Sequence, residues 1–422
     1  MGLADVLAAV LDPRAPLEIV AYDGSRAGAP DAPNRVEIRR RRAVSYITHA
    51  PGSLGFARAY VKRDIEVSGD LHGALAALQT MDISRLGRRE RVGLARAAGL
   101  ALLRRPRPPR QEVRLRGTPH SKRRDAKAVA HHYDVSNRFY ELFLGPSMAY
   151  TCAVFPSYNA TLERAQWTKF DLVARKLGLR PGMRLLDVGC GWGGMVIHAA
   201  RDYGARALGV TLSRRQAEWA QKAIAEAGLS DRAEVRHLDY RDVTEGGFDA
   251  VASIGLTEHI GIAQLPAYFA TLYGRLRPGG RLLNHCITRP NTATQGIDED
   301  GFINRYVFPD GELASVGHLV TQMQDVGFEV RHAEDLREHY AMTLREWVAN
   351  LEAHWAEAVR EAGEERARVW QLYMAGSRVG FERNEIQLHQ VLGVRLDGAD
   401  ARFPLRPDFE PPGPPSPPSP PS

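Results

Sequence analysis

The chain has 422 residues, of which 44% are hydrophobic and 25% are charged. This is the composition of an ordinary globular protein, and the length is enough for two or three domains. No apolar run reaches the roughly 18 residues that span a bilayer, and the N-terminal stretch lacks the basic region and cleavage site of a signal peptide. We therefore expect neither a membrane-spanning nor a secreted protein, and the cytoplasm is the expected location.

The net charge of +6 is concentrated in residues 104–127, which we call the basic segment. It contains ten Lys or Arg and two acidic residues, a net charge of +8, so the rest of the chain carries about −2. Three interpretations stay open at this point: a solvated linker, a contact with an anionic membrane surface, and a contact with nucleic acid.

Residues 1–103 predict a small α+β domain. Apolar and polar residues alternate in LEIVAY, RVEIRRRRAVSYIT and RAYVKRDIEVSG, which predicts strands separated by Gly, Pro and Asp. Helices are predicted at DLHGALAAL and over residues 85–105. The second helix mixes leucine with arginine, which is typical either of a helix in a membrane interface or of one packed on its own domain. The Pro-rich residues 104–125 predict a mobile linker.

A second domain is predicted over residues 126–400. Apolar strand patterns alternate with helical ones from RLLDV to RLLNHCI, which predicts a doubly wound α/β fold with a parallel sheet. The Pro-Gly-Gly at 278–280 predicts the end of a helix and a turn before RLLNHCI. Residues 343–394 are predicted to be mostly helical. The tail over 401–422, which ends in PPGPPSPPSPPS, cannot form a core and is predicted to be disordered.

The stretch LLDVGCGWGG, residues 185–194, is the strongest local signal for a ligand site. Asp187 ends an apolar strand, and Gly189, Gly191 and Gly193 follow before a helical pattern begins. Ligands bind where such strands end, and glycines let the ligand approach the backbone closely. A carboxylate before the turn suits a nucleoside with a cationic amino-acid tail. We interpret the stretch as an S-adenosylmethionine site, ahead of a dinucleotide site or a purely structural turn.

The next two strand ends supply further candidates for this site. A dinucleotide fold places an acid after its second strand to bind the ribose hydroxyls; here Thr211, Ser213 and Gln216 stand in its place and can still hydrogen-bond a diol. Asp239, which follows the third strand, is predicted to meet the adenine amino group, with Tyr240 beside the ring. The alternative for Asp239 is a helix cap or a surface salt bridge.

Two later strands end in GLTEHIG and NHCI, which bring more polar groups to the same edge of the sheet. Taken singly, each has an ordinary structural explanation; taken together, they are expected to converge on the cofactor cleft. Three widely spaced cysteines in the chain argue against a disulfide framework or a metal site, so no metal is expected. The converging residues, including two from other motifs, are Glu258, His259, His285, Cys286, Cys152 and Tyr340.

At this point the sequence resembles the cyclopropane-fatty-acyl-phospholipid synthase family of S-adenosylmethionine-dependent methyltransferases, which includes the mycolic acid cyclopropane synthases. The resemblance covers residues 126 to about 392, and residues 1–103 more weakly resemble the extra domain of the phospholipid-acting members. It implies a doubly wound, Rossmann-like class I methyltransferase sheet with a smaller α+β N-terminal domain. The matching motifs are HHYDVSNRFYELFLG, MAYTCAVF, LLDVGCGWGG, GVTLSRRQ, DYRDV, TEHIG, NHCIT, RYVFPDGEL and HYAMTLREW.

The resemblance also implies which residues do the chemistry. In the family, five positions surround a bound bicarbonate, and all five residue types are present here. Carried over, the catalytic residues are Cys152, Glu258, His285, Ile287 and Tyr340. The cofactor-binding residues are expected to be Tyr150, Thr151, Asp187, Gly189, Gly191, Gly193, Thr211, Ser213, Gln216, Asp239 and Tyr240.

The implied reaction transfers a methyl carbon to the cis double bond of an unsaturated phospholipid acyl chain, through a carbocation that closes to a cyclopropane, and leaves S-adenosylhomocysteine. Aromatic faces can stabilise such a cation while water is kept out. Two products stay open: a cyclopropane, or a methylene branch that needs a partner reductase to become a methyl branch. The aromatic candidates are Tyr306, Phe308, Tyr340 and Trp347.

The expected partner is an anionic membrane, which the protein would meet at its inner face as a peripheral, cytoplasmic protein, and a homodimer is also open. A phospholipid substrate is favoured over an acyl-carrier-bound one by the N-terminal domain and the basic segment. A non-catalytic lipid-binding protein is disfavoured because the site residues are intact. A nucleic-acid partner is not expected, because TEHIG stands where nucleotide methyltransferases often carry an N/D-P-P-Y/F motif.

Overall fold

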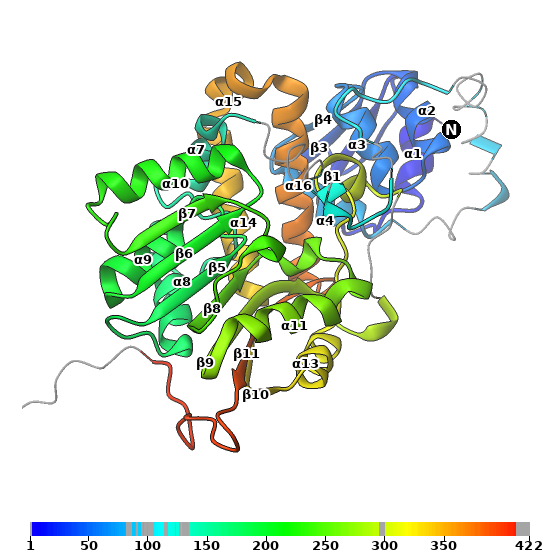
Figure 1. Ribbon diagram of the computed structural model, residues 1–422. Coiled ribbons are helices and arrows are strands. Elements are labelled where there is room, and N and C mark those ends of the chain that lie inside the picture. Colours follow the sequence, from blue (N-terminus) through cyan, green and yellow to red (C-terminus); the bar gives the residue numbers. More distant parts are fainter. Residues whose placement is uncertain are drawn as a thin grey trace, which may run out of the picture. The chain divides into compact units, whose positions relative to one another are not determined.

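A computed structural model describes residues 2–81, 87–89, 92–93, 96, 99, 105–113, 117–122, 124–125, 128, 135–294 and 300–410. The chain divides into two compact units (Figure 1). Unit 1 contains Met1–Gly145, Ala293–Leu313 and Arg337–Gln387, and unit 2 contains Pro146–Thr292, Ala314–Leu336 and Leu388–Ser422. Most of the helix predicted over 85–105, parts of the basic segment, and residues 411–422 of the tail lie outside the described residues. Among the described helices, none is long and apolar enough to cross a membrane.

Unit 1 is built on a four-stranded sheet in the order β2-β1-β3-β4, with β1 parallel to β3 and the other pairs antiparallel. Apolar side chains of the strands and of the first helices form its core, in which Leu17, Ile19 and Val36 are buried. The elements are α1 Leu3–Ala8, β1 Leu17–Ala21, β2 Arg26–Gly28, β3 Asn34–Ile38, α2 Arg41–His49, α3 Ser53–Val61, β4 Ile65–Ser68, α4 Leu71–Leu78, α7 Asn137–Leu144, α12 Phe302–Tyr306, α14 Arg337–Ala353, α15 Trp355–Ala362 and α16 Glu364–Glu382.

Two of the segments predicted as strands in unit 1 are only partly strands: RVEI lies in β3 and IEVS is β4, and the rest is largely helical. The second half of RVEIRRRRAVSYIT forms α2, and the start of RAYVKRDIEVSG completes α3. The reason is visible in α3, where the buried Leu54, Ala57 and Val61 recur at i, i+3 and i+7, the spacing of a helix face. In these segments, the alternation of apolar and polar residues over a few positions therefore wrongly indicated a strand.

The described part of the basic segment is anchored within unit 1, although a mobile linker was expected. Glu112 accepts hydrogen bonds of 2.7 Å from Arg58 and 2.6 Å from Arg305, and its side chain is only 3% exposed. Val113 N donates to Arg305 O over 2.8 Å, and Tyr46 donates its hydroxyl to Arg107 O over 2.7 Å. A buried carboxylate thus ties this stretch to α3 and α12.

Replacing Glu112 by Gln is expected to lower the stability of unit 1 by about 3 kcal/mol, because two buried guanidinium groups lose their counter-charge. Burial alone would raise the pKa of Glu112, but the hydrogen bonds from Arg58 and Arg305 outweigh it and lower the pKa. The contribution is therefore present above the unfolded pKa of about 4.3 and is lost as the pH falls through the lowered folded pKa. Thermal denaturation against pH measures it.

The matched control for this prediction is Glu37→Gln, which breaks an ion pair with Arg39 in which both side chains are 41% exposed. Exposed pairs contribute about 0.5 kcal/mol. Equal melting temperatures of the Glu112→Gln and Glu37→Gln proteins at neutral pH would contradict the anchoring role.

Unit 2 is built on a seven-stranded sheet in the order β10-β11-β9-β8-β5-β6-β7. Strands β9, β8, β5, β6 and β7 run parallel to their neighbours, and β10 is antiparallel to β11. The elements are α8 Leu162–Leu177, β5 Arg184–Val188, α9 Gly194–Tyr203, β6 Arg206–Thr211, α10 Arg214–Glu226, β7 Ala233–His237, η3 Tyr240–Asp242, β8 Phe248–Ile254, η4 Thr257–His259, η5 Ile262–Gln264, α11 Leu265–Arg275, β9 Leu276–Thr288, α13 Val316–Asp325, β10 Phe328–Asp335 and β11 Gln387–Arg395. A short turn of 3-10 helix, η6 Thr292–Thr294, follows β9 at the boundary between the units.

Helices cover both faces of this sheet, which confirms the predicted doubly wound α/β fold (Figure 1). Successive residues of β5 point to opposite faces: Leu185 joins the core under α8, α9 and α10, and Leu186 joins the core under α11 and α13. Because both faces are buried, the central strands carry nearly continuous apolar runs and do not alternate.

The antiparallel pair β10 and β11, at one side of the sheet, was not predicted. Residues 387–394, expected to be helical, belong to β11, and β10 completes the antiparallel pair. Seven successive residues of β11 are buried, so the segment has no period-two pattern, and a short apolar run of this kind cannot be told from a buried helix. Strand β9 also begins earlier than expected, at Leu276, and the predicted turn at Gly279 is a bulge within it.

Candidate active site

The glycine turn joins β5 to α9 in unit 2. Gly189, Gly191 and Gly193 all have positive φ, of +72°, +54° and +83°. A side chain at Gly193 would meet Ala220 at 2.9 Å, and one at Gly189 would meet Leu256 at 3.1 Å. At Gly191, by contrast, no atom lies within 4 Å of the position that a Cβ would take. The turn is therefore packed against protein on two sides and is open at Gly191, where a ligand can approach the backbone.

Asp187 is buried at the end of β5, and its Oδ1 has no hydrogen-bond partner among the described residues. Burial raises the pKa of this carboxyl to about 7, and the nearby charge of Lys169 opposes the shift. A buried acceptor without a partner is costly unless a ligand supplies a donor. An ammonium or hydroxyl group of a ligand would meet this need.

Lys169 on α8 is a site residue that the sequence analysis missed. It is fully buried, and its Nζ donates to Thr151 Oγ1 over 2.8 Å and lies 3.9 Å from the centroid of the Phe170 ring. Burial lowers the pKa of Lys169 to about 7, and the charges of Cys152 and Asp187 act in the opposite direction. One lysine therefore lies among three of the predicted site residues.

Thr211, Ser213 and Gln216 form one hydrogen-bonded group at the end of β6. Thr211 Oγ1 lies 2.8 Å from Gln216 Oε1, and Ser213 caps the N-terminus of α10 by accepting from Gln216 N. All three are buried, at 3% to 8% exposure. The structure brings these predicted residues together, and their contact with a ribose stays a prediction.

Asp239 follows β7 and has the structural role that was considered as the alternative. It accepts hydrogen bonds from Arg241 N and Arg241 Nε, both over 2.9 Å, and caps the short helix η3. Its neighbour Tyr240 packs edge-on against Tyr268, with 5.3 Å between the ring centroids. An adenine contact for Asp239 and Tyr240 is therefore still a prediction.

Glu258 and His285 come from the neighbouring strand ends of β8 and β9. Glu258 Oε1 accepts a hydrogen bond of 2.8 Å from Ile287 N, two residues after His285. Glu258 Oε2 and His285 Nε2 are both buried and have no partner among the described residues. Burial raises the pKa of Glu258 to about 7 and, together with the positive charges of Lys169 and Lys176, holds the pKa of His285 well below 6.5.

The loop that precedes α8 brings Tyr150, Thr151 and Cys152 to the same side of unit 2. Gln166 Nε2 donates to Thr151 O over 3.0 Å, and the Cys152 thiol, which is fully buried, contacts Ala153 O at 3.2 Å. The link between this loop and the strand ends is Lys169, which shares electrostatic interactions with Cys152, Asp187 and His285.

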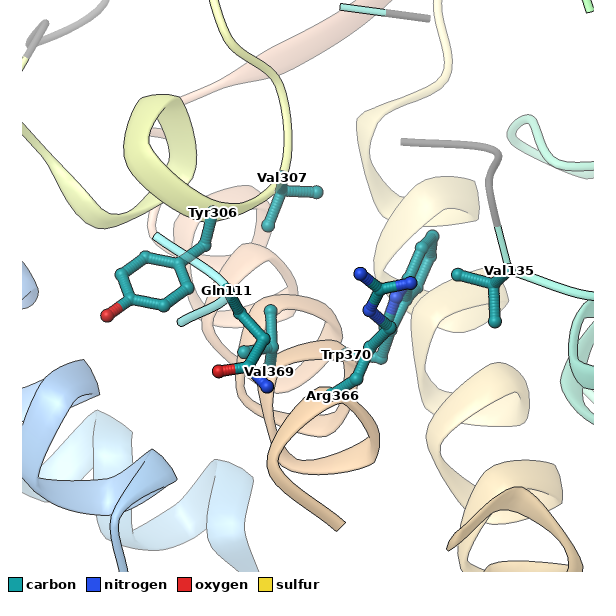
Figure 2. Close-up of a pocket in the computed structure, with 7 residues that line it drawn as sticks. All are labelled: Gln111, Val135, Tyr306, Val307, Arg366, Val369 and Trp370. Atoms are coloured by element: carbon teal, nitrogen blue, oxygen red, sulfur yellow. The ribbon is translucent and has the colours of Figure 1, made fainter. Parts of the chain in front are cut away.

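Tyr340 and the other aromatic candidates belong to unit 1. The Tyr340 ring packs on Phe381, with 4.5 Å between centroids. Tyr306 lines a cavity between the α12 segment and α16 (Figure 2). Its hydroxyl donates to Glu112 over 3.3 Å. These contacts describe how the rings are held within unit 1. Their predicted roles towards the residues of unit 2 stay predictions.

A sequence signal for the missed residues exists in α8. The buried face of this helix carries Gln166, Lys169 and Lys176 at the positions i, i+3 and i+10, where apolar residues are expected. Polar residues on a buried helix face are unusual and indicate buried partners. For Gln390 on β11, which contacts His285 and Lys176, no such signal exists, because the strand itself was not predicted.

The doubly wound sheet, the glycine turn after β5 and the polar residues at the ends of β6 to β9 define a class I S-adenosylmethionine-dependent methyltransferase. Comparison with known proteins agrees with this class. The profile of the mycolic acid cyclopropane synthetase family matches residues 120–391. The chain belongs to this family, and at that level it is an S-adenosylmethionine-dependent lipid methyltransferase.

Three similar proteins show how far the likeness extends. A probable fatty acid methyltransferase of Mycobacterium tuberculosis is 53% identical over 408 residues, which cover 94% of this chain and 95% of the relative. A probable fatty acid methyltransferase of Pseudomonas putida is 36% identical over 384 residues, 90% of this chain and 92% of the relative. The solved mycolic acid cyclopropane synthase CmaA1, complexed with SAH and CTAB, is 33% identical, with a TM-score of 0.60 over 64% of this chain and 97% of its own.

Proposed function

We propose that this protein transfers a methyl carbon from S-adenosylmethionine to the cis double bond of an unsaturated phospholipid acyl chain and converts that bond to a cyclopropane. The observation that carries the proposal is the pair of buried polar atoms Glu258 Oε2 and His285 Nε2, at neighbouring strand ends in a cofactor fold. An isolated alkene has no proton to lose before it is methylated. The site must therefore manage a proton after the methyl transfer.

The residues present fit S-adenosylmethionine. Asp187 Oδ1 offers an unpartnered acceptor to a cationic or hydroxyl group, and the open backbone at Gly191 leaves room for the ligand. The buried Thr211 and Gln216 follow at the next strand end. The bound cofactor would supply an electrophilic methyl group on a sulfonium. The similar cyclopropane synthase CmaA1 was solved in complex with SAH, which supports this assignment.

The residues also fit a small oxyanion such as bicarbonate, which would supply the base. Glu258 Oε2 is an acceptor when it is ionised, and His285 Nε2 lies on the neighbouring strand end. Together they can hold a group that both donates and accepts hydrogen bonds. Both atoms are buried, which keeps from them the water that would otherwise capture a carbocation on the acyl chain. Cys152, Ile287 and Tyr340 complete the proposed catalytic set.

A methylene branch is the alternative product, and the names of the two relatives, both probable fatty acid methyltransferases, are the reason to consider it. If the proton leaves a chain carbon and not the added methyl group, the product is a methylene branch, which a partner reductase would convert to a methyl branch. Expression in a bacterium that makes neither cyclopropane nor methyl-branched fatty acids, followed by ¹H NMR of its phospholipid acyl chains, tests the proposal, because the two products are isomers with the same mass and differ in their proton signals. A cyclopropane supports it, and a methylene or methyl branch would replace it with the alternative product.

We also propose peripheral binding at the inner face of an anionic membrane through the basic segment. Arg105, Arg107 and Arg110 are exposed, whereas Arg124 forms an ion pair with Asp310 and so has its charge compensated. Basic residues near an anionic surface contribute about 1 kcal/mol each. Replacing the three exposed arginines by Gln is expected to weaken binding to phosphatidylglycerol vesicles at least about tenfold, as measured by co-sedimentation.

The control triple variant replaces Arg180, Arg206 and Arg214, which are exposed on unit 2, and should bind as the wild type does. Binding should also disappear at 1 M salt, where the Debye length is about 3 Å. Equal loss in both triple variants, or equal binding to neutral and anionic vesicles, would show that the basic segment is not the contact.

A further inference from the structure

Three buried side chains form a hydrogen-bonded chain that ends on His285. Lys176 Nζ donates to Gln390 Oε1 over 2.7 Å, and Gln390 Nε2 lies 3.1 Å from His285 Nδ1. Lys176 and Gln390 are 0% exposed and His285 is 1% exposed. The contact occupies Nδ1 and leaves Nε2, which has no partner among the described residues, as the nitrogen that faces a ligand.

Lys176 determines which way the Gln390 amide points. The oxygen and nitrogen of an amide have nearly the same shape, so their partners decide the orientation. Burial lowers the pKa of Lys176, and the carboxylate of Glu334 opposes this shift. Nζ donates one hydrogen bond to that carboxylate and one to the amide, so the lysine is the donor in both contacts. A reversed amide would turn its NH2 group towards an ammonium. Gln390 therefore presents its NH2 group to His285.

An amide NH2 group can only donate, so His285 Nδ1 must accept and carries no proton. Burial and the positive charges of Lys169 and Lys176 keep the imidazole neutral by holding its pKa low. A neutral imidazole has a single proton, which must then be on Nε2. This tautomer of His285 would be lost if the side chain at position 390 or 176 no longer donated its hydrogen bond.

We propose that Gln390, oriented by Lys176, is a positioning residue that holds His285 in the tautomer protonated on Nε2, so that His285 enters the site as a neutral hydrogen-bond donor. The roles then divide: Glu258 Oε2 accepts, His285 Nε2–H donates, and His285 is not the base. The identity of the acceptor, a small oxyanion, rests on the proposed function. The tautomer itself is a property of the protein without ligand.

The test is the ¹⁵N NMR spectrum of the full-length protein labelled at histidine, with the His285 signals assigned by their loss in His285→Asn. The wild type should show Nδ1 as an unprotonated acceptor and Nε2 as a protonated nitrogen. Gln390→Met keeps the length of the side chain and removes the amide, so both tautomers should appear. Gln390→Glu can only accept from the imidazole when ionised, so Nδ1 should gain a proton. Lys176→Arg should keep the wild-type spectrum, and Lys176→Met should lose it.

The matched control is Gln221→Met. Gln221 also donates a hydrogen bond, to Val235 O on β7 at the opposite edge of the sheet, and its loss should leave the His285 signals unchanged. In turnover assays, Gln390→Met should lower kcat about 10- to 100-fold with unchanged affinity for S-adenosylmethionine, by analogy with the loss that follows when the partner of a metal-binding histidine is removed.

Two results would overturn the inference: a wild-type spectrum with the proton on Nδ1, or a Gln390→Met spectrum identical to that of the wild type. Once His285→Asn has assigned the His285 signals, the wild-type spectrum is decisive by itself, so the test does not depend on the folding of the Gln390 or Lys176 variants. If this protein shows the expected spectrum but acts on a different substrate, the inference stands and the proposed function is wrong.

Discussion

Replacing Glu258 by Gln is expected to lower turnover about 10³-fold and to leave the affinity for S-adenosylmethionine unchanged. Glutamine has the same shape and keeps the hydrogen bond from Ile287 N to Oε1. It replaces the buried acceptor Oε2, however, by an NH2 group that can only donate. General acid–base catalysis contributes about 10² to 10⁴ in rate, and this contribution is lost if the base is no longer held in the site. His285→Ala is expected to have the same signature, because it removes Nε2 and not a cofactor contact.

Single-turnover kinetics and isothermal titration with S-adenosylmethionine separate the two effects. Glu226→Gln, an exposed residue at the end of α10, controls for the loss of one negative charge. Wild-type turnover in the Glu258→Gln protein would remove Glu258 from the site. A parallel loss of cofactor affinity would instead assign Glu258 to cofactor binding.

The same residue predicts a pH dependence. Burial raises the pKa of Glu258 to about 7, although the hydrogen bond from Ile287 N opposes the shift. In the proposed mechanism Glu258 must be ionised, because a protonated Oε2 would donate a hydrogen bond where an acceptor is needed, while Oε1 accepts from Ile287 N. At a fixed concentration of bicarbonate, turnover should therefore fall as the pH falls through about 7. Because glutamine does not titrate, the residual activity of Glu258→Gln should lack this acid limb; a wild-type rate that is flat from about pH 5.5 to about pH 8 would contradict the assignment.

Gly191→Val is expected to weaken S-adenosylmethionine binding about 100-fold, a loss of about 3 kcal/mol. The backbone at Gly191 has a φ of +54°, which a β-branched residue adopts only with strain. No protein atom lies within 4 Å of the new Cβ, so the isopropyl group would occupy the open space beside the turn that the ligand is proposed to fill. Isothermal titration of the purified protein measures the affinity.

Gly228→Val is the control that separates backbone strain from occupation of the space that the ligand is proposed to fill. Gly228 follows α10, has a φ of +66° and likewise has no atom within 4 Å of the position that a Cβ would take, but it is not part of the glycine turn. Its substitution should cost a similar amount of stability and leave the affinity for S-adenosylmethionine unchanged. If both variants bind S-adenosylmethionine like the wild type, the ligand does not approach the turn at Gly191.

Most of the predicted cofactor and catalytic positions are adjacent to strands that the sequence marks clearly. Asp187, Thr211, Glu258 and His285 each follow an apolar run and lie close to the C-terminal end of a strand, with Asp187 and His285 inside β5 and β9 and Glu258 just after β8. In a parallel sheet these ends meet at one edge, so a pattern that is local in the sequence predicts a shared site. The doubly wound fold could be predicted for the same reason.

The tertiary structure alone decided which residues from other elements reach the site at the strand ends. Lys169 and Lys176 reach the site because α8 packs its face on the sheet, and Gln390 reaches His285 because β11 lies next to β9. These contacts join residues that are far apart in the chain, and Gln390 and His285 are separated by 105 positions. Neither periodicity nor spacing carries information about such pairs.

The grouping of the chain into units was equally beyond local patterns. Helices α14 to α16, and with them Tyr340, belong to the same unit as the N-terminal sheet, although the whole of the seven-stranded sheet up to β10 lies between them in the chain. Arg58, Glu112 and Arg305 form one buried ion cluster from three distant segments. Sequence by itself thus determined the family, the doubly wound sheet and the strand-end residues, because each depends on short-range patterns. Which buried charges meet, and how they set the protonation of His285, depends on long-range packing that only the folded chain defines.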